Sequence, residues 1–259
     1  MEQTADLDCK GAGKVYFIEL GDRSAPTVIM LHGAFFVDAF GRQYPLRDRY
    51  HLVIPHIKGF GKAAKETFET GPALEEVREL ISQYGEPVYV IGFSLGAQLA
   101  FKLVSENPEL FRKAILVSPF LMKKDEISEQ VMDENLKMLR SMKNRFFCHA
   151  IGLMNGLPKQ SRADFVGSMQ LVSEETVRNC VDNGISFDTV DSYSACNVPI
   201  LALAGGKEQA EVKDSVKRMA ELNPHCRYEI WDKAKHNIPP VFAKRLNETI
   251  LSFFPADRE

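Results

Sequence analysis

Short apolar runs alternate with stretches of helical periodicity through most of this chain, and this alternation is the feature that most constrains its fold. The runs have the length and composition of buried strands and lie at residues 15–20, 27–31, 51–54, 88–91, 113–117, 199–204 and 227–231. Residues 73–84, 211–222 and 241–254 each place their apolar side chains on one helical face. We therefore predict an α/β fold with a mostly parallel central sheet and helices on both faces.

The alternation stops between residues 122 and 197. This segment contains no convincing strand, and turn signals at 155–158 and 182–184 separate several helical stretches. We therefore expect a core formed by residues 1–121 and 198–259, with residues 122–197 inserted as a helical cap.

Methionines gather in the expected cap. Six of the nine lie there, at positions 122, 132, 138, 142, 154 and 169, beside Phe146 and Phe147. Such side chains would suit a deformable apolar wall around a hydrophobic ligand. They would suit equally well a packing core of the cap that touches no ligand.

The pentapeptide GFSLG at residues 92–96 lies between the apolar run 88–91 and a helical pattern over 95–105. A serine at such a strand-to-helix turn is held in a strained backbone conformation, and the flanking glycines keep the strand and the helix from colliding. Ser94 would then stand exposed above the sheet, so we predict that it is a nucleophile.

A nucleophilic serine needs a general base, and histidine titrates in the suitable range. In open α/β sheets the reactive groups gather at the carboxyl ends of the strands. His236 follows the strand that ends at residue 231, whereas His51 and His225 precede their strands and should lie at the opposite edge. We therefore predict His236 as the base.

The histidine in turn needs an acid that fixes its tautomer and stabilises its positive form. Glu208, just beyond the strand 199–204, is our first choice. Glu211 and Asp214 lie a turn further along the chain, and Asp125 is an alternative that follows a different strand.

An oxyanion intermediate requires fixed hydrogen-bond donors. The Leu95 amide follows the nucleophile at the positive end of the next helix. The second donor should come from the loop after residue 31, where Gly33 permits a close turn and leaves Ala34, or less favourably Phe35, as the donor. We interpret His32 as a structural hydrogen-bonding residue.

Taken together, these motifs resemble the α/β-hydrolase superfamily: HG at 32–33, KGFG at 58–61, the turn at Ser94, Glu208 and His236. The resemblance covers nearly the whole chain. It implies the chain order nucleophile, acid, histidine, a helical cap over the site, and hydrolysis of an ester, thioester or related bond. Serine as nucleophile argues against the activities of this superfamily that require a carboxylate nucleophile.

The chain departs from the superfamily pattern at two positions. The acid is a glutamate where aspartate is more usual, and His56 stands where an aspartate frequently precedes the glycine-rich turn. His56 should lie at the edge that carries the site, where it could line the pocket, pack in the interior or face solvent.

Composition excludes several other classes. A net charge of -3 with 26% charged residues offers no basic excess to attract nucleic acid or an anionic membrane, so we expect a small-molecule substrate. The chain shows no secretory signal pattern and no membrane-spanning apolar run, which predicts a cytoplasmic protein. The five cysteines are scattered and predict free thiols. The sequence does not predict the oligomeric state.

The leading hypothesis is thus a serine hydrolase that forms an acyl-enzyme on Ser94 and needs no cofactor and no metal. Its substrate would be a small or medium carboxylic ester, thioester or lactone. The alternative keeps the fold but assigns a non-hydrolytic role: elimination, carbon–carbon bond cleavage or ligand binding as a receptor.

Overall fold

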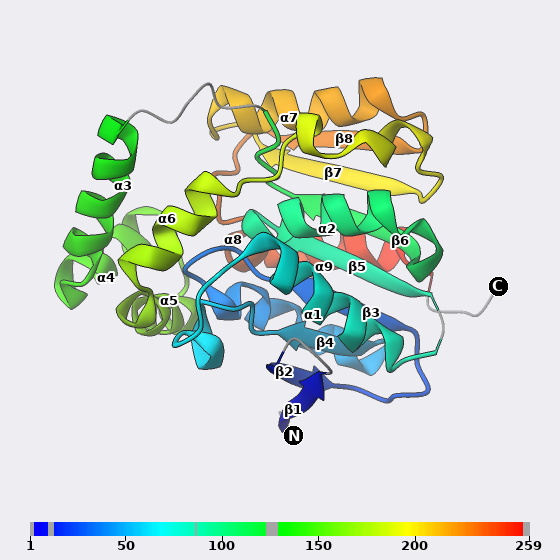
Figure 1. Ribbon diagram of the computed structural model, residues 1–259, viewed down its shortest axis with the longest axis horizontal. Coiled ribbons are helices and arrows are strands. Elements are labelled where there is room, and N and C mark those ends of the chain that lie inside the picture. The colour runs from blue at the N-terminus through cyan, green and yellow to red at the C-terminus, as the bar shows by residue number, and fades with distance from the viewer. Residues whose placement is uncertain (1–2, 10–12, 86, 123–128, 256–259) are drawn as a thin grey trace.

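The computed structural model describes residues 3–9, 13–85, 87–122 and 129–255. In this part of the chain eight strands form one sheet, in the order β1-β2-β4-β3-β5-β6-β7-β8 (Figure 1). The strands are β1 (Gln3–Cys9), β2 (Gly13–Leu20), β3 (Thr27–Leu31), β4 (His51–Pro55), β5 (Val88–Phe93), β6 (Phe111–Val117), β7 (Ile200–Gly205) and β8 (Cys226–Trp231). β3 to β8 run parallel, and β1 and β2 pair antiparallel at one edge. The prediction of a mostly parallel sheet is confirmed.

All seven predicted strands are present, but the sequence did not indicate β1. Its residues QTADLDC contain few apolar side chains. β1 pairs only with β2, at the end of the sheet. An edge strand has one neighbour, so it need not carry the apolar run by which a central strand is found.

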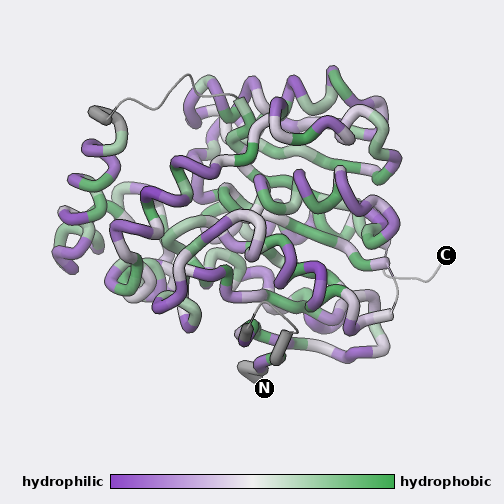
Figure 2. The backbone as a smooth tube through the Cα atoms, viewed as in Figure 1, coloured by the Kyte–Doolittle hydropathy of each residue, from purple (hydrophilic) through white to green (hydrophobic). Residues whose placement is uncertain are grey.

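Helices cover both faces of the sheet, and each face has its own apolar core. One core includes side chains from α1 (Thr70–Ser82), α2 (Leu95–Glu106) and α7 (Ala210–Leu222). The other includes side chains from the 3-10 segment η1 (Val37–Asp48) and from α9 (Ala243–Phe253). The pleat divides each strand between the two cores, which is why the central strands are apolar along their whole length (Figure 2).

The remaining segments are short. In the core they are η2 (Gly61–Ala63), η3 (Pro108–Leu110) and the helix α8 (Ile238–Val241), and in the segment 122–197 they are η4 (Phe187–Thr189) and η5 (Asp191–Ala195). The single helix expected over 241–254 is therefore interrupted, because Phe242 has φ -104° and ψ 33° and separates α8 from α9.

The described part of residues 122–197 contains no strand. It forms four helices, α3 (Glu129–Met142), α4 (Arg145–Met154), α5 (Lys159–Leu171) and α6 (Glu174–Asp182), before η4 and η5. Figure 1 shows these helices together at one end of the sheet. Local chemistry sets two of their boundaries, since the side chains of Asn144 and Ser173 accept hydrogen bonds from the first-turn amides of α4 and α6.

The six methionines of this segment serve different purposes. Met132, Met142 and Met169 are buried in the packing of the helices. Met138 and Met154 are exposed, and Met122 lines the cavity beside Ser94. The apolar-wall interpretation therefore applies to one methionine of the six, and internal packing accounts for three.

None of the helices in the part of the chain that the structure describes combines the length and the apolar character that a membrane span requires.

Candidate active site

Ser94 sits at a sharp turn between β5 and α2. Its backbone has φ 53° and ψ -115°, a conformation that side-chain-bearing residues rarely adopt. The turn closes tightly because its glycines have no side chain: a Cβ on Gly92 would lie 2.3 Å from the Gly96 carbonyl oxygen, and one on Gly96 would lie 2.0 Å from the Leu31 carbonyl oxygen. The backbone of this turn therefore holds Ser94 at the carboxyl end of the sheet.

Strained backbone conformations cluster at this carboxyl end of the sheet. Among the described residues, the non-glycine positions with positive φ are Phe35, Ser94 and Ser118. They follow β3, β5 and β6, respectively. Such strained positions persist only where the surrounding structure fixes them, and they cluster at functional sites.

A chain of hydrogen bonds joins Ser94, His236 and Glu208. His236 Nδ1 lies 2.6 Å from Glu208 Oε1, and His236 Nε2 lies 3.1 Å from Ser94 Oγ. A carboxylate only accepts, so Nδ1 carries the proton and Nε2 is left to accept from the serine hydroxyl. The structure thus brings the three predicted residues together in the orientation that proton transfer from Ser94 to His236 requires.

Glu208 and His236 meet because the loops after β7 and β8 are pinned to one another. The Lys207 amide donates to the Ala234 carbonyl oxygen at 3.0 Å. A Cβ on Gly205 would lie 2.4 Å from that same oxygen, so this approach is open only to glycine. The close packing lets a glutamate reach the histidine although the superfamily more often uses aspartate.

Glu208 is held on its second oxygen as well. Oε2 accepts from the Ser118 hydroxyl at 2.9 Å and from the Gly205 amide. The Glu208 side chain is 2% exposed, so these bonds replace the water that the carboxylate has lost. The sequence did not indicate Ser118 as part of the site, because a serine is neither a base nor an acid. Its position directly after β6 was the available signal.

The predicted oxyanion donors lie at the same cavity as Ser94. Leu95 is the first residue of α2, where amides lack an acceptor within the helix. Ala34 lies in the turn closed by the bond from the Phe36 amide to the Gly33 carbonyl oxygen, and Phe35 occupies the strained position of that turn. Ala34, Phe35, Ser94 and Leu95 all line the cavity.

His32 holds the loop that carries Ala34. Its Nδ1–H donates to the Gly33 carbonyl oxygen at 2.8 Å, and its Nε2 accepts from the Ile57 amide at 3.1 Å. Complete burial lowers the pKa of His32 to about 3, so the ring is neutral at pH 7. The geometry agrees with the structural role expected for this residue.

His56 is buried beside the glycine-rich turn and is not among the residues that line the cavity. Its Nδ1 accepts from the Lys62 amide at 3.1 Å, and burial lowers the pKa of its ring to about 4. A Cβ on Gly61 would lie 2.3 Å from His56 Nδ1, so the glycine makes room for the ring. His56 therefore packs in the interior, one of the three positions left open by the sequence.

Two of the alternative acids, Glu211 and Asp214, form no hydrogen bond with His236, whose ring bonds Glu208 and Ser94. Glu211 and Asp214 lie on α7, where Asp214 pairs with Lys217 at 3.1 Å. Asp125 lies outside the described residues. Within the described ranges, no group of three or more histidine, cysteine or acidic side chains is arranged to hold a metal ion.

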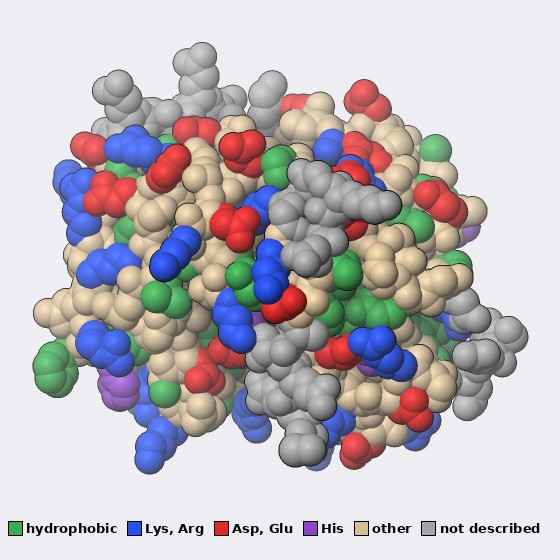
Figure 3. All heavy atoms as spheres, turned by 60° about the horizontal axis from the view of Figure 1, so that its bottom comes forward, with side chains coloured by type: hydrophobic (Ala, Val, Ile, Leu, Met, Phe, Trp, Pro, Cys, Tyr) green, Lys and Arg blue, Asp and Glu red, His purple; other side chains and the backbone are tan. Residues whose placement is uncertain are grey.

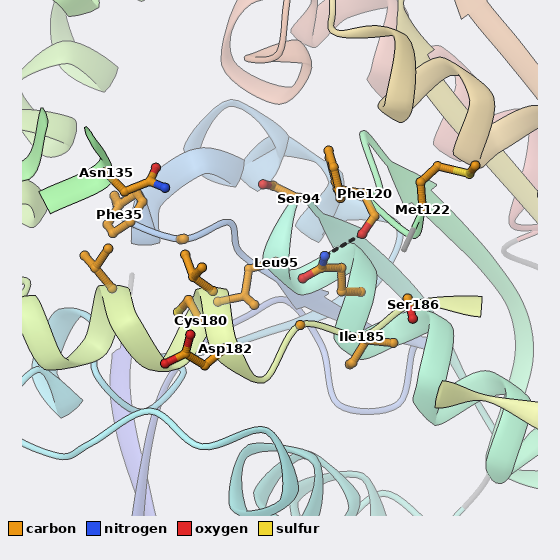
Figure 4. Close-up of a pocket in the computed structure, with 15 residues that line it drawn as sticks. Phe35, Ser94, Leu95, Phe120, Met122, Asn135, Cys180, Asp182, Ile185 and Ser186 are labelled. Carbon is orange, nitrogen blue, oxygen red and sulfur yellow. Dashed lines mark hydrogen bonds between the residues drawn. The ribbon is translucent and has the colours of Figure 1, made fainter. Parts of the chain in front are cut away.

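A cavity of about 720 Å³ opens beside Ser94 between the strand ends and the helical segment. Figure 4 shows Ser94, Leu95 and Phe35 facing residues of α6 and of the loop that follows it, which contribute Val181, Ile185 and others. The Cys180 thiol also lines the cavity, and burial raises its pKa to about 12, so it stays protonated at pH 7. Ser94 is therefore the residue at this cavity whose hydroxyl is bonded to a base.

Comparison with known proteins gives the family to which this fold belongs. The family model described as alpha/beta hydrolase fold matches residues 26–241. The chain belongs to this family, as the strand order and the turn at Ser94 led us to expect.

Curated relatives match over most of their length. The chain is 23% identical over 256 residues to the carboxylesterase YbfK of Bacillus subtilis, covering 93% of this chain and 84% of that protein. It is 24% identical over 226 residues to the pimeloyl-[acyl-carrier protein] methyl ester esterase of Aeromonas hydrophila, covering 82% and 88%. Among solved structures, E-2-(acetamidomethylene)succinate hydrolase superposes with a TM-score of 0.78 at 16% identity, covering 98% of this chain and 99% of that chain.

Proposed function

We propose that this protein is a serine hydrolase that cleaves a small or medium carboxylic ester, thioester or lactone through an acyl-enzyme on Ser94. The observation that carries the proposal is the continuous hydrogen-bonded chain from Ser94 Oγ through His236 to Glu208. The names of the two curated relatives, a carboxylesterase and a methyl ester esterase, support ester hydrolysis as the reaction class.

In the first half of the proposed reaction, Ser94 Oγ attacks the carbonyl carbon of the substrate while His236 Nε2 takes the hydroxyl proton. Glu208 stabilises the imidazolium and keeps Nδ1 protonated. The amides of Ala34 and Leu95 would donate to the oxyanion of the tetrahedral intermediate. Collapse of the intermediate breaks the bond to the leaving group, which takes the proton from His236 and departs as an alcohol or thiol.

Water completes the cycle. His236 removes a proton from a water molecule that attacks the acyl carbon, and the proton is returned to Ser94 Oγ as the acid is released. The His236 side chain is 48% exposed, so water can reach its ring. These steps use only water and the side chains and backbone amides of this chain.

The cavity supports a substrate of modest size. Its volume of about 720 Å³ falls within the range that encloses small organic ligands. Its walls come from two parts of the chain: Ala34, Ser94 and Leu95 from the strand ends, and Val177 and Ile185 from the helical segment. We accordingly propose that residues 122–197 act as a cap that selects the substrate.

Covalent labelling tests the nucleophile. Wild type should react with a fluorophosphonate probe and hydrolyse p-nitrophenyl esters of graded chain length. Ser94→Ala should lose labelling and lower kcat/KM by about 10⁵-fold, because the nucleophile itself is removed. Intact-mass measurement would report the labelling, and ester hydrolysis would report the rate.

Ser186 provides the matched control, since it is another serine that lines the cavity but has no histidine partner in the structure. Ser186→Ala should still be labelled. A wild type that resists the probe, or a Ser94→Ala variant labelled as fully as wild type, would contradict the proposal.

A further inference from the structure

Helix α4 carries large apolar side chains on the side that points to solvent. Its inner face is buried at Cys148 and Gly152. On its outer side, Phe146 is 90% exposed, Leu153 59% and Met154 73%. Arg145 and His149 are also exposed on this helix, and His149 Nε2 accepts from Arg162 Nε at 3.2 Å. Within the described part of the chain, no neighbour covers the three apolar side chains, and such exposed apolar groups mark an interaction surface.

The sequence around this helix is basic. Residues 143–162 carry Lys143, Arg145, Lys159 and Arg162 and no aspartate or glutamate, within a chain whose net charge is -3. Lys143 donates to carbonyl oxygens at the end of α5, and Arg162 donates to the Leu157 carbonyl oxygen. Arg145 and Lys159 are both exposed to solvent.

Two further cations adjoin the end of α4. Lys233 and Lys235 line a small hollow together with Met154, and Lys235 Nζ donates to the Met154 carbonyl oxygen at 3.2 Å. Across the described residues, Arg145, Lys159 and both of these lysines form no ion pair with a carboxylate. Figure 3 shows hydrophobic, cationic, histidine and acidic side chains together at the edge where the cap helices lie.

We propose that this α4 surface, formed by Phe146, Leu153 and Met154 with the cations Arg145, Lys159, Lys233 and Lys235, docks on an anionic lipid surface. A lipid interface accepts protruding apolar side chains without a shape-matched pocket, and its negative headgroups attract the surrounding cations. An exposed apolar helix face bordered by Lys and Arg has the composition of an interfacial helix. Asp232 is an exposed carboxylate in the same loop as the two lysines, and the cations outnumber it.

The net charge does not oppose this docking. At physiological ionic strength, charges more than about 8 Å apart are largely screened from one another, so the local distribution of charge decides attraction to a surface. The expectation that the chain would not be attracted to an anionic membrane considered only the sum over all residues. The fold places several cations around one apolar face, and the net charge of the whole chain does not reveal this local excess.

The α4 surface also adjoins the candidate active site, because Lys235 directly precedes His236 in the chain. Docking would therefore hold the loop of His236 close to the lipid. The docking proposal itself does not rest on the proposed hydrolysis, since it concerns binding alone.

Vesicle co-sedimentation tests the proposal with the full chain. Wild type should bind vesicles of equal parts phosphatidylglycerol and phosphatidylcholine at least about tenfold more strongly than vesicles of phosphatidylcholine alone, and added salt should weaken the binding. The double variant Phe146→Ser with Met154→Ser should bind about tenfold more weakly. Arg145→Gln with Lys235→Gln should remove most of the preference for the anionic vesicles.

Matched controls separate docking from other effects. Leu251 is an exposed leucine on α9, and Leu251→Ser should bind as wild type does. Ser94→Ala should also bind as wild type does, which distinguishes docking from capture of lipid as a substrate.

Three results of the vesicle experiment would overturn the proposal. They are absence of wild-type binding, equal binding to both kinds of vesicle, and unchanged binding of the two double variants. A wild-type dimer that Phe146→Ser with Met154→Ser converts to a monomer in analytical ultracentrifugation would likewise overturn it, because a second copy of the chain would then cover α4.

Discussion

The carboxyl ends of the strands, called the sheet edge below, and the helical segment beside them hold their side chains in different ways. At the sheet edge, the backbone of a glycine-flanked turn fixes Ser94, and three hydrogen bonds fix the carboxylate of Glu208. In the helical segment, apolar packing dominates, and Phe146 and Met154 extend into solvent. The comparison teaches that reacting groups need fixed directions, whereas a wall around a ligand needs only shape.

The largest effect should come from the sheet edge. His236→Ala should lower kcat by about 10⁵-fold, because no base then remains for Ser94. Glu208→Gln should lower kcat by about 10⁴-fold, which is roughly tenfold less than His236→Ala, since the histidine loses only its charged partner. Steady-state hydrolysis of a p-nitrophenyl ester would measure both. Glu211→Gln, which changes an exposed acid on α7, is the control and should leave kcat unchanged. If Glu211→Gln lost most of its kcat while Glu208→Gln stayed active, Glu211 and not Glu208 would be the acid.

Acid should destabilise the core through its buried histidines. Burial lowers the pKa of His32 to about 3 and of His56 to about 4, below the value near 6.5 of an exposed histidine. Above pH 6.5 both histidines are neutral in the folded and in the unfolded chain, so they do not make the free energy of unfolding depend on pH. As the pH falls below 6.5, the two histidines bind protons in the unfolded chain but stay neutral in the folded chain. These two histidines together should therefore lower the free energy of unfolding by about 2 kcal/mol per pH unit between pH 5.5 and 4.5. Burial raises the pKa of Glu76 to about 7, and this carboxyl contributes in the opposite direction.

Urea unfolding at several pH values would measure this slope. His56→Asn should reduce it by about 1 kcal/mol per pH unit. His149→Asn is the control, because it removes a histidine at a solvent-exposed position of α4. A slope that His149→Asn reduces as much as His56→Asn does would contradict the assignment of this effect to buried histidines.

Ser118→Ala should have an intermediate effect at the sheet edge. Its hydroxyl bonds only the far oxygen of Glu208, so its loss should lower kcat by about tenfold and leave KM unchanged. This split between kcat and KM distinguishes a positioning residue from a general loss of folding. Ser105→Ala removes a buried hydroxyl from α2 that bonds the Phe101 carbonyl oxygen, and it should alter neither constant. An unchanged kcat in Ser118→Ala would show that the Gly205 amide suffices to hold Glu208.

The smallest effect on turnover should come from the cavity wall. Val181→Trp would fill part of the cavity from α6 and should raise KM for long acyl chains by about tenfold, while kcat for the acetate ester changes less than about twofold. Leu171→Trp adds the same ring at an exposed position of α5 outside the cavity and serves as control. A uniform loss for all chain lengths in Val181→Trp would indicate that this wall also positions the reacting groups.

The sequence by itself determined the parts of this protein that depend on local pattern. The apolar runs predicted seven of the strands, because a strand covered on both faces must be apolar along its length. The turn at Ser94 was also recognisable, since its glycines are required by contacts between neighbouring segments of the chain. Glu208 and His236 were predicted from one rule, the gathering of reactive groups at the carboxyl ends of parallel strands, and the structure joins them by a hydrogen bond.

Only the tertiary structure decided what depends on contacts between distant segments. Ser118 binds Glu208 across 90 residues of chain, and no local pattern marks a serine for that purpose. Methionines of the helical segment look alike in sequence, yet Met142 is buried and Met154 is exposed. The gathering of cations around α4 likewise arises when residues 143–162 fold against the loop of Lys235. Periodicity records which face of an element is apolar, whereas the neighbour of that face is set by the packing of the whole chain.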